Sequence, residues 1–257
     1  MELWTPEHTN TLLPALAVMI LLSLVLGAVL RSRPLKVRML PVQIIACILV
    51  ILEIGKQAVS LSRGYDLYHL PFHFCSLFIF ALPVMAFYRG KHRAAVTAVT
   101  TALCGSLFLL MLIYPNLIYS AGNIESYFKG YLDFHTVTFH NLVMLAFLLI
   151  VTLQLHTPQP QKETKPVILF TLGFCVVSAT MAQILKTNYA NFYTCNVPVF
   201  EELRVSLQSS LGYVPTQLLY ILIVTALNIG FVLMSYWFST LLLKLFAPSR
   251  QPAVISK

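Results

Sequence analysis

The amino-acid sequence predicts an all-α membrane protein, a polytopic bundle of about seven transmembrane helices, from three observations. The 257-residue chain is 58% hydrophobic and only 10% charged, which is far more apolar than a soluble domain of its size. Its apolar residues fall in stretches of about 20, the length that a helix needs to cross a bilayer core of about 30 Å. These stretches lack the alternating pattern of a transmembrane barrel. We therefore expect a single integral-membrane domain over residues 1–257.

The expected spans follow the apolar stretches in chain order. They are residues 11–30, 40–60, 70–88, 94–113, 135–155, 166–185 and 217–246. The last of them is long enough to tilt or to extend beyond the lipid. Before it, the amphipathic run at residues 198–211 predicts a short helix lying at the membrane surface.

The basic residues orient this bundle, because the cytoplasmic loops of membrane proteins are enriched in Lys and Arg. With the N-terminus outside and the C-terminus inside, the inner segments hold 12 of the 17 basic residues and one acid, Glu163. The inner charge of +11 and the outer charge of −3 then account for the net charge of +8. Topology and anionic inner lipids explain this excess, so it does not indicate a nucleic-acid partner.

Polar side chains at membrane depth gather at the outer ends of the expected spans. The inner half of the bundle offers little that is comparable. Ionisable groups within spans are costly and usually face an interior cavity, so this asymmetry predicts a polar pocket open to the outer leaflet. The residues concerned are Glu53, Lys56, Gln57, His69, His73, Cys75, Ser76, Tyr114, Asn116, His135, His140, Asn141, Gln183, Tyr213, Thr216 and Gln217.

Glu53 is the one acid placed well inside an expected span. Lys56 follows three residues later, a spacing that puts both side chains on one helix face and allows an ion pair. Such a pair can simply anchor the helix end, with Lys56 extending toward the headgroups. Alternatively, Glu53 orients a histidine or a substrate headgroup.

The stretch "YHLPFHFCSLFIF" at residues 68–80 opens the third expected span with two histidines and a cysteine. In a regular helix His69 and His73 share a face, and Cys75 lies about 200° beyond His73. Cys75 would then need a base from another helix, for which His140 is the best-placed candidate. A thiol made nucleophilic by an adjacent imidazole is typical of acyl transfer. The plainer interpretation is a packed thiol and a histidine that hydrogen-bonds a carbonyl group.

Three segments of the sequence resemble the YwaF-type family of polytopic membrane proteins. They are "LPFHFCSLFIF" at 70–80, "FHTVTFHNLVML" at 134–145 and "TNYANF" at 187–192. Eukaryotic relatives of that family act as phospholipid acyltransferases, and the group is similar in architecture to the androgen-induced lipid hydrolases. The resemblance implies that Cys75 is the nucleophile, that His140 is its partner and that His73 supports them.

The leading hypothesis is a membrane acyltransferase that moves a fatty acyl group between phospholipid and lysophospholipid substrates. Cys75 and His140 would carry the chemistry, and Asn141, Gln183 or Tyr189 would stabilise the oxyanion. Glu53, Lys56 and His135 are further supporting candidates. We expect no cofactor, and the short tails favour a bacterial cell membrane as the location.

Other classes remain open from the sequence. If water replaces the acceptor, the same dyad makes a hydrolase. A zinc-dependent hydrolase would instead use His69, His73 and His140 as metal ligands, since His69 and His73 have helical ligand spacing. The third alternative is a transporter or receptor-like bundle whose outer pocket only binds a ligand. The sequence does not predict the oligomeric state.

Overall fold

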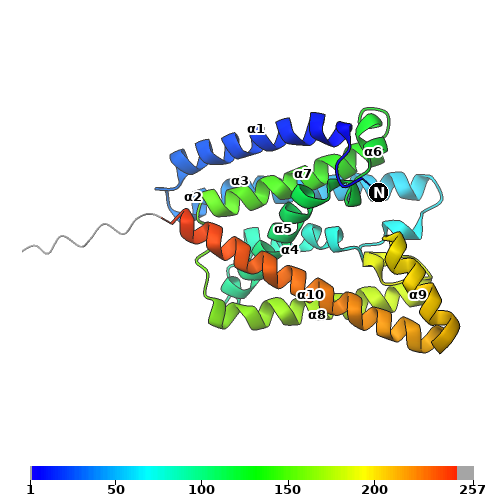
Figure 1. The fold of residues 1–257 in the computed structure, drawn as a ribbon. Coiled ribbons are helices and arrows are strands. Elements are labelled where there is room, and N and C mark those ends of the chain that lie inside the picture. Colours follow the sequence, from blue (N-terminus) through cyan, green and yellow to red (C-terminus); the bar gives the residue numbers. More distant parts are fainter. Residues whose placement is uncertain (1, 248–257) are drawn as a thin grey trace, which may run out of the picture.

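The protein is a helical bundle, which a computed structural model describes over residues 2–247 (Figure 1). No β-strand occurs within these residues. The α-helices are α1 (Pro6–Leu30), α2 (Leu35–Arg38), α3 (Leu40–Ser62), α4 (Phe78–Phe87), α5 (Arg93–Ile113), α6 (Ala121–Glu125), α7 (Tyr131–Thr152), α8 (Pro160–Leu185), α9 (Pro198–Leu211) and α10 (Tyr213–Leu245). Short 3-10 helices are η1 (Leu67–His69), η2 (Phe74–Leu77), η3 (Pro115–Leu117) and η4 (Tyr189–Asn191).

Within the described residues, six helices are long and apolar enough to cross a membrane, and the segment Phe74–Phe87 is a shorter apolar helix. Many large apolar side chains of α1, α8 and α10 face outward, as lipid-facing surfaces do. The predicted fold class is confirmed: the chain is an all-α, multi-pass integral membrane protein. The helix Pro198–Leu211 also forms where the amphipathic run predicts it.

The helices pack in layers around α5. In Figure 1, α1, α3 and α7 lie on one side, α8 and α10 on the other, and α4 and α5 between them. The middle of α5 is buried almost all round, and many of its residues there are small, which lets α7 and α10 approach closely. The main hydrophobic core therefore lies along α5 and α7.

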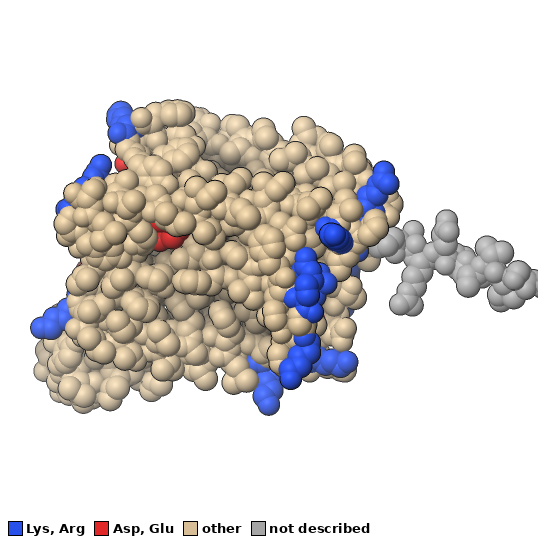
Figure 2. Space-filling model, turned by 180° about the vertical axis from the view of Figure 1, so that it is seen from behind, with Lys and Arg blue, Asp and Glu red and all other residues tan. Residues whose placement is uncertain are grey.

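Basic side chains gather at one end of the bundle, as Figure 2 shows. We call it the basic end; the predicted inner segments after α1, between α4 and α5, and at the start of α8 supply its Lys and Arg residues. No membrane is part of the structure, so the orientation of the termini stays a prediction.

The third expected span differs from the structure. A regular helix was predicted over residues 70–88, but α4 begins only at Phe78, after the short η2 helix. Leu70 precedes Pro71, which disfavours helical dihedral angles, and Leu70 accordingly has φ −63° and ψ 147°. Since ten helical residues extend about 15 Å, α4 alone crosses about half of a bilayer core.

Gly105 of α5 lies at a close contact with α7 and α10 in the core. A Cβ atom there would lie 2.5 Å from Ser239 Oγ and 3.2 Å from the Phe147 ring. We expect Gly105→Ala to destabilise the protein by about 1–3 kcal/mol, because overpacking forces neighbouring groups to shift. Thermal unfolding in detergent measures the effect.

A matched control for Gly105 is Gly173 of α8, where an added Cβ would meet no atom within 4 Å. Gly173→Ala should be neutral or stabilise by about 0.5–1 kcal/mol, since alanine restricts the unfolded chain. Adding Ser239→Ala to Gly105→Ala should recover part of the loss. Equal unfolding temperatures for the two glycine variants would contradict the close approach.

Candidate functional site

A polar cavity lies at the end of the bundle opposite the basic end, where α3 ends and α7 begins. Its volume is about 190 Å³, and α3, the segment before α4, and α7 supply most of its walls. The lining residues are Glu53, Lys56, Tyr68, His69, His73, Cys75, Ser76, Ile118, Leu132, His135, Thr136, Phe139 and His140. Two residues distant in sequence, Cys75 and His140, thus line one cavity.

The irregular backbone before Cys75 is stabilised by side chains from other elements. Gln57 Nε2 donates to the His69 carbonyl at 2.9 Å, and Ser178 Oγ donates to the Phe72 carbonyl at 2.8 Å. Tyr189 Oη donates to the carbonyl of Leu67 at 2.5 Å. Non-helical backbone at membrane depth is tolerated only where protein groups satisfy it or where it lines a cavity, and both conditions hold here.

The ring of His140 is held in one orientation by its own helix. Nδ1 lies 2.6 Å from the carbonyl oxygen of Thr136, so Nδ1 carries the proton and donates it to this hydrogen bond. The lone pair of a neutral imidazole is then on Nε2. The side chain is buried, and Phe139 packs edge-on against the ring with centroids 5.6 Å apart. His140 is therefore preorganised to accept a proton through Nε2.

Glu53 is the centre of a charged network on the cavity wall. Its Oε1 lies 2.8 Å from Lys56 Nζ and accepts a hydrogen bond from Gln57 Nε2 at 2.7 Å. Its Oε2 lies 3.3 Å from His135 Nε2, which is close enough for an ion pair, although that nitrogen makes no aligned hydrogen bond. The ion pair that the sequence spacing allows is thus present. It keeps two charges at the cavity without leaving either uncompensated.

A tyrosine outside the spans extends this network. Tyr65 Oη donates to Gln57 Oε1 at 2.8 Å. Burial and the nearby Glu53 carboxylate raise the pKa of Tyr65, so the hydroxyl keeps the proton that it donates. Gln57 is therefore fixed between Tyr65 and Glu53.

His69 and His73 do not share a helix face, because the segment that joins them is not helical. His69 Nδ1 hydrogen-bonds with Ser60 Oγ at 2.7 Å, and His73 Nε2 donates to the Tyr68 carbonyl at 3.0 Å. The rotation of a regular helix therefore does not separate Cys75 from His73 in this segment. His73 becomes a second candidate base for Cys75.

The alternative zinc site of His69, His73 and His140 lacks a suitable geometry. Among residues 2–247, no group of three or more His, Cys, Asp or Glu side chains is arranged to hold a metal ion. The helical ligand spacing on which that site rested is absent, since Leu70 and His73 both have extended backbone. This alternative set of metal ligands stays a prediction, without support from the helical spacing.

Three predicted supporting residues do not line the cavity: Asn141, Gln183 and Tyr189. Gln183 donates to the Phe192 carbonyl at 2.9 Å and accepts from Tyr213 at 3.2 Å. Tyr189 is fully buried and contacts His73 edge-on, with ring centroids 5.3 Å apart. Gln183 and Tyr189 therefore stabilise the loops beside the cavity, whereas Asn141 Oδ1 is buried without a hydrogen-bond partner among the described residues.

Five lining residues were not predicted: Tyr68, Ile118, Leu132, Thr136 and Phe139. Tyr68 packs against the His73 ring, with centroids 4.3 Å apart, and Thr136 supplies the carbonyl that fixes His140. Thr136 lies four residues before His140, a helical spacing that could have indicated the contact. Tyr68 opens the stretch at residues 68–80 that the sequence singled out, but only its histidines and cysteine were considered.

A family model described as the TMEM164 family matches residues 3–236, a range that includes every residue of the cavity wall. No curated protein and no solved structure shows significant similarity to the chain.

Proposed function

For this chain, which belongs to the TMEM164 family of transmembrane proteins, we propose the function of a membrane enzyme that transfers fatty acyl groups between phospholipids. The observation that carries the proposal is the presence of Cys75 and His140 in the wall of one polar cavity. The resemblance of residues 70–80 and 134–145 to the YwaF-type family adds the chemical class. Residence in a bacterial cell membrane stays a prediction.

In the proposed first step, His140 Nε2 takes the proton of the Cys75 thiol. The thiolate attacks the ester carbonyl carbon of a phospholipid, and the ester C–O bond breaks. The leaving glycerol oxygen takes the proton back from His140, which releases a lysophospholipid. The acyl chain is now held as a thioester on Cys75.

In the second step, the hydroxyl group of another lysophospholipid enters the cavity. His140 takes its proton, the oxygen attacks the thioester carbonyl, and the C–S bond breaks. The Cys75 thiolate then recovers the proton from His140. The two steps together return the dyad to its starting state, so no cofactor or further reactant is needed.

Ser76 is the best-placed hydroxyl donor for the oxyanion in this proposal. It follows Cys75 directly, is buried and lines the same cavity. It replaces Asn141, Gln183 and Tyr189 in that role, since these three do not line the cavity. Lys56 and His69 also lie on the wall, where we expect them to donate hydrogen bonds to the phosphate group of the proposed phospholipid substrate.

The size of the cavity limits what it accepts. A volume of about 190 Å³ equals about six water molecules at ~30 Å³ each, which suits an ester group and its glycerol carbon. The acyl chains would extend outside the cavity, along the apolar surface of the bundle.

Trapping the acyl-enzyme tests the proposal. The full chain is incubated with a phospholipid that carries an alkyne-tagged acyl chain, quenched in acid and analysed for tag on the protein. We expect a label that hydroxylamine removes, as it does thioesters, and that Cys75→Ala loses. Cys195→Ala is the matched control, since Cys195 is also half-buried and lies outside the cavity wall.

Two results would count against this chemistry. A label that survives in Cys75→Ala would place the nucleophile elsewhere, and unchanged labelling in His140→Ala would remove His140 as the base. Free fatty acid as the sole product in the presence of lysophospholipid would identify a hydrolase instead of a transferase.

A further inference from the structure

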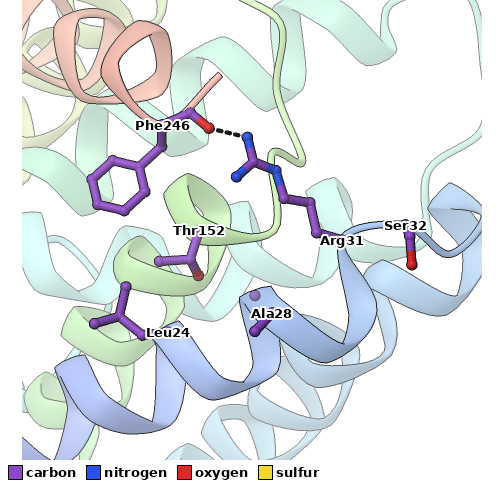
Figure 3. A pocket seen from close by; sticks show the side chains of 7 residues that line it. Leu24, Ala28, Arg31, Ser32, Thr152 and Phe246 are labelled. Atoms are coloured by element: carbon purple, nitrogen blue, oxygen red, sulfur yellow. Dashed lines mark hydrogen bonds between the residues drawn. The ribbon is translucent and has the colours of Figure 1, made fainter. Parts of the chain in front are cut away.

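A second, larger depression lies at the basic end of the bundle, between the last turns of α1, α7 and α10 (Figure 3). Its volume is about 600 Å³. We call it the α1–α10 groove; it is lined by Leu24, Gly27, Ala28, Arg31, Ser32, Thr152 and Phe246. It shares no residue with the cavity of Cys75 and His140.

The floor of the groove is apolar and lies on the last turns of the candidate membrane span α1. α1 packs mainly along α7, and at Gly27 the two helices are so close that a Cβ would lie 3.2 Å from Thr152 Cβ. Leu24 and Ala28 stay exposed beside this contact, and the Phe246 ring borders them. Since Leu24 and Arg31 are seven residues apart, the wall runs for about 10 Å along α1.

Arg31 stands at the polar end of this wall. One guanidinium nitrogen donates to the carbonyl of Phe246, beyond the end of α10 (Figure 3). A guanidinium has five N–H donors, so most of them are left for another acceptor. Within residues 2–247, no acidic side chain lines the groove and Arg31 forms no salt bridge. The positive charge of Arg31 is therefore not neutralised there.

An apolar wall that ends in an uncompensated guanidinium matches an amphiphile with an anionic headgroup. We propose that the α1–α10 groove binds an anionic phospholipid from the leaflet at the basic end. Its acyl chain lies along Leu24 and Ala28, and its phosphate group accepts hydrogen bonds from Arg31 and Ser32. The bound lipid fills the space between α1 and α10 and so holds α1 on the bundle.

Two other occupants fit the groove less well. The last ten residues of the chain, 248–257, carry Arg250 and Lys257 and no acid, so their charge does not complement Arg31. A soluble phosphate ion would pair with Arg31 but would leave the apolar wall uncovered. Charge and hydrophobicity together favour the lipid.

Lipid-dependent thermal stability tests the proposal on the full chain in detergent. The unfolding temperature is measured with phosphatidylglycerol, phosphatidylcholine or glycerol 1-phosphate added at matched concentrations. We expect phosphatidylglycerol to raise it most. Arg31→Gln should raise the half-saturating concentration of phosphatidylglycerol about tenfold, because a charge-assisted hydrogen bond to the lipid is lost. Arg33→Gln removes the same charge from an exposed position outside the groove and should leave binding unchanged.

A second variant separates the groove from a general charge effect. Ala28→Phe keeps Arg31 but fills the apolar wall, so it should also weaken phosphatidylglycerol binding. Native mass spectrometry of the same variants counts the bound lipid directly, even for a variant whose stability has fallen.

Four outcomes would overturn the proposal. Equal stabilisation by phosphatidylcholine would remove the requirement for charge, and equal stabilisation by glycerol 1-phosphate would identify a site for soluble anions. Unchanged lipid binding in both Arg31→Gln and Ala28→Phe would move the site elsewhere. Lipid binding that appears only after deletion of residues 248–257 would show that this tail occupies the groove.

Discussion

Replacing Cys75 by alanine is expected to abolish acyl transfer while the protein still folds. The thiol is the sole nucleophile of the proposed mechanism, and alanine removes only the sulfur atom from the cavity wall. His140→Ala should lower the rate by about 10²–10⁴-fold, the usual contribution of a positioned general base. Release of lysophospholipid in liposomes of defined composition measures both rates.

The two residues should behave as one unit. If His140 acts only through Cys75, the double variant is no slower than Cys75→Ala alone. Cys195→Ala should retain the full rate. Normal turnover by Cys75→Ala, at an unfolding temperature equal to that of the unchanged chain, would eliminate the thiol mechanism.

His73→Ala decides between the two candidate bases. His73 donates through Nε2 to the Tyr68 carbonyl and packs between Tyr68 and Tyr189, so its loss should loosen the segment before Cys75. We expect a smaller loss of rate than for His140→Ala, together with a lower unfolding temperature. A larger loss of rate at unchanged stability would assign the base to His73.

The largest expected effect on stability comes from Glu163 at the basic end. Glu163 is only 2% exposed, and its Oε2 accepts hydrogen bonds from Tyr236 Oη at 2.6 Å and Gln159 N at 2.9 Å. His156 Nε2 lies 3.2 Å from the same oxygen. These contacts join α8, α10 and the loop after α7. Glu163→Ala should destabilise the protein by about 3–5 kcal/mol, because it leaves several buried donors unpaired.

Unfolding in detergent measures this loss, with Glu202→Ala as the matched control. Glu202 is an exposed acid of α9, so its replacement removes the same charge without breaking a buried network. Adding Tyr236→Phe to Glu163→Ala should cost little more, since their shared hydrogen bond is already gone. An unfolding temperature of Glu163→Ala equal to that of Glu202→Ala would contradict the structural role.

Glu163 also illustrates the limits of charge counting. The sequence places it in a polar inner linker with Lys162 and Lys165, where it counts as one surface charge. In the structure α8 begins at Pro160, earlier than the predicted start at residue 166, and Glu163 faces inward. Burial depends on Tyr236, 73 residues away, which no local pattern reveals.

The sequence predicted which residues lie at the candidate site better than it predicted how their side chains are oriented. Cys75, His140, Glu53 and Lys56 line the cavity, since polar residues clustered at the same ends of separate spans must share one region of the bundle. The predicted donors Asn141 and Gln183 lie outside the cavity wall, because a helix can turn a polar residue to either side of the cavity. The rotation of a helix about its axis is set by packing against neighbouring helices, so it cannot be predicted from a single sequence.

The sequence by itself determined the class of the protein and the end of the bundle where the polar cavity lies. Hydrophobicity over about 20 residues is a local property, and it suffices to mark a membrane helix. Only the tertiary structure decided the shape of the motif "YHLPFHFCSLFIF" at 68–80. Donors from Gln57, Ser178 and Tyr189 satisfy its carbonyl groups, which allows a non-helical backbone at membrane depth. That break brings Cys75, His73 and His140 to one cavity, because the backbone there no longer follows the rotation of a helix.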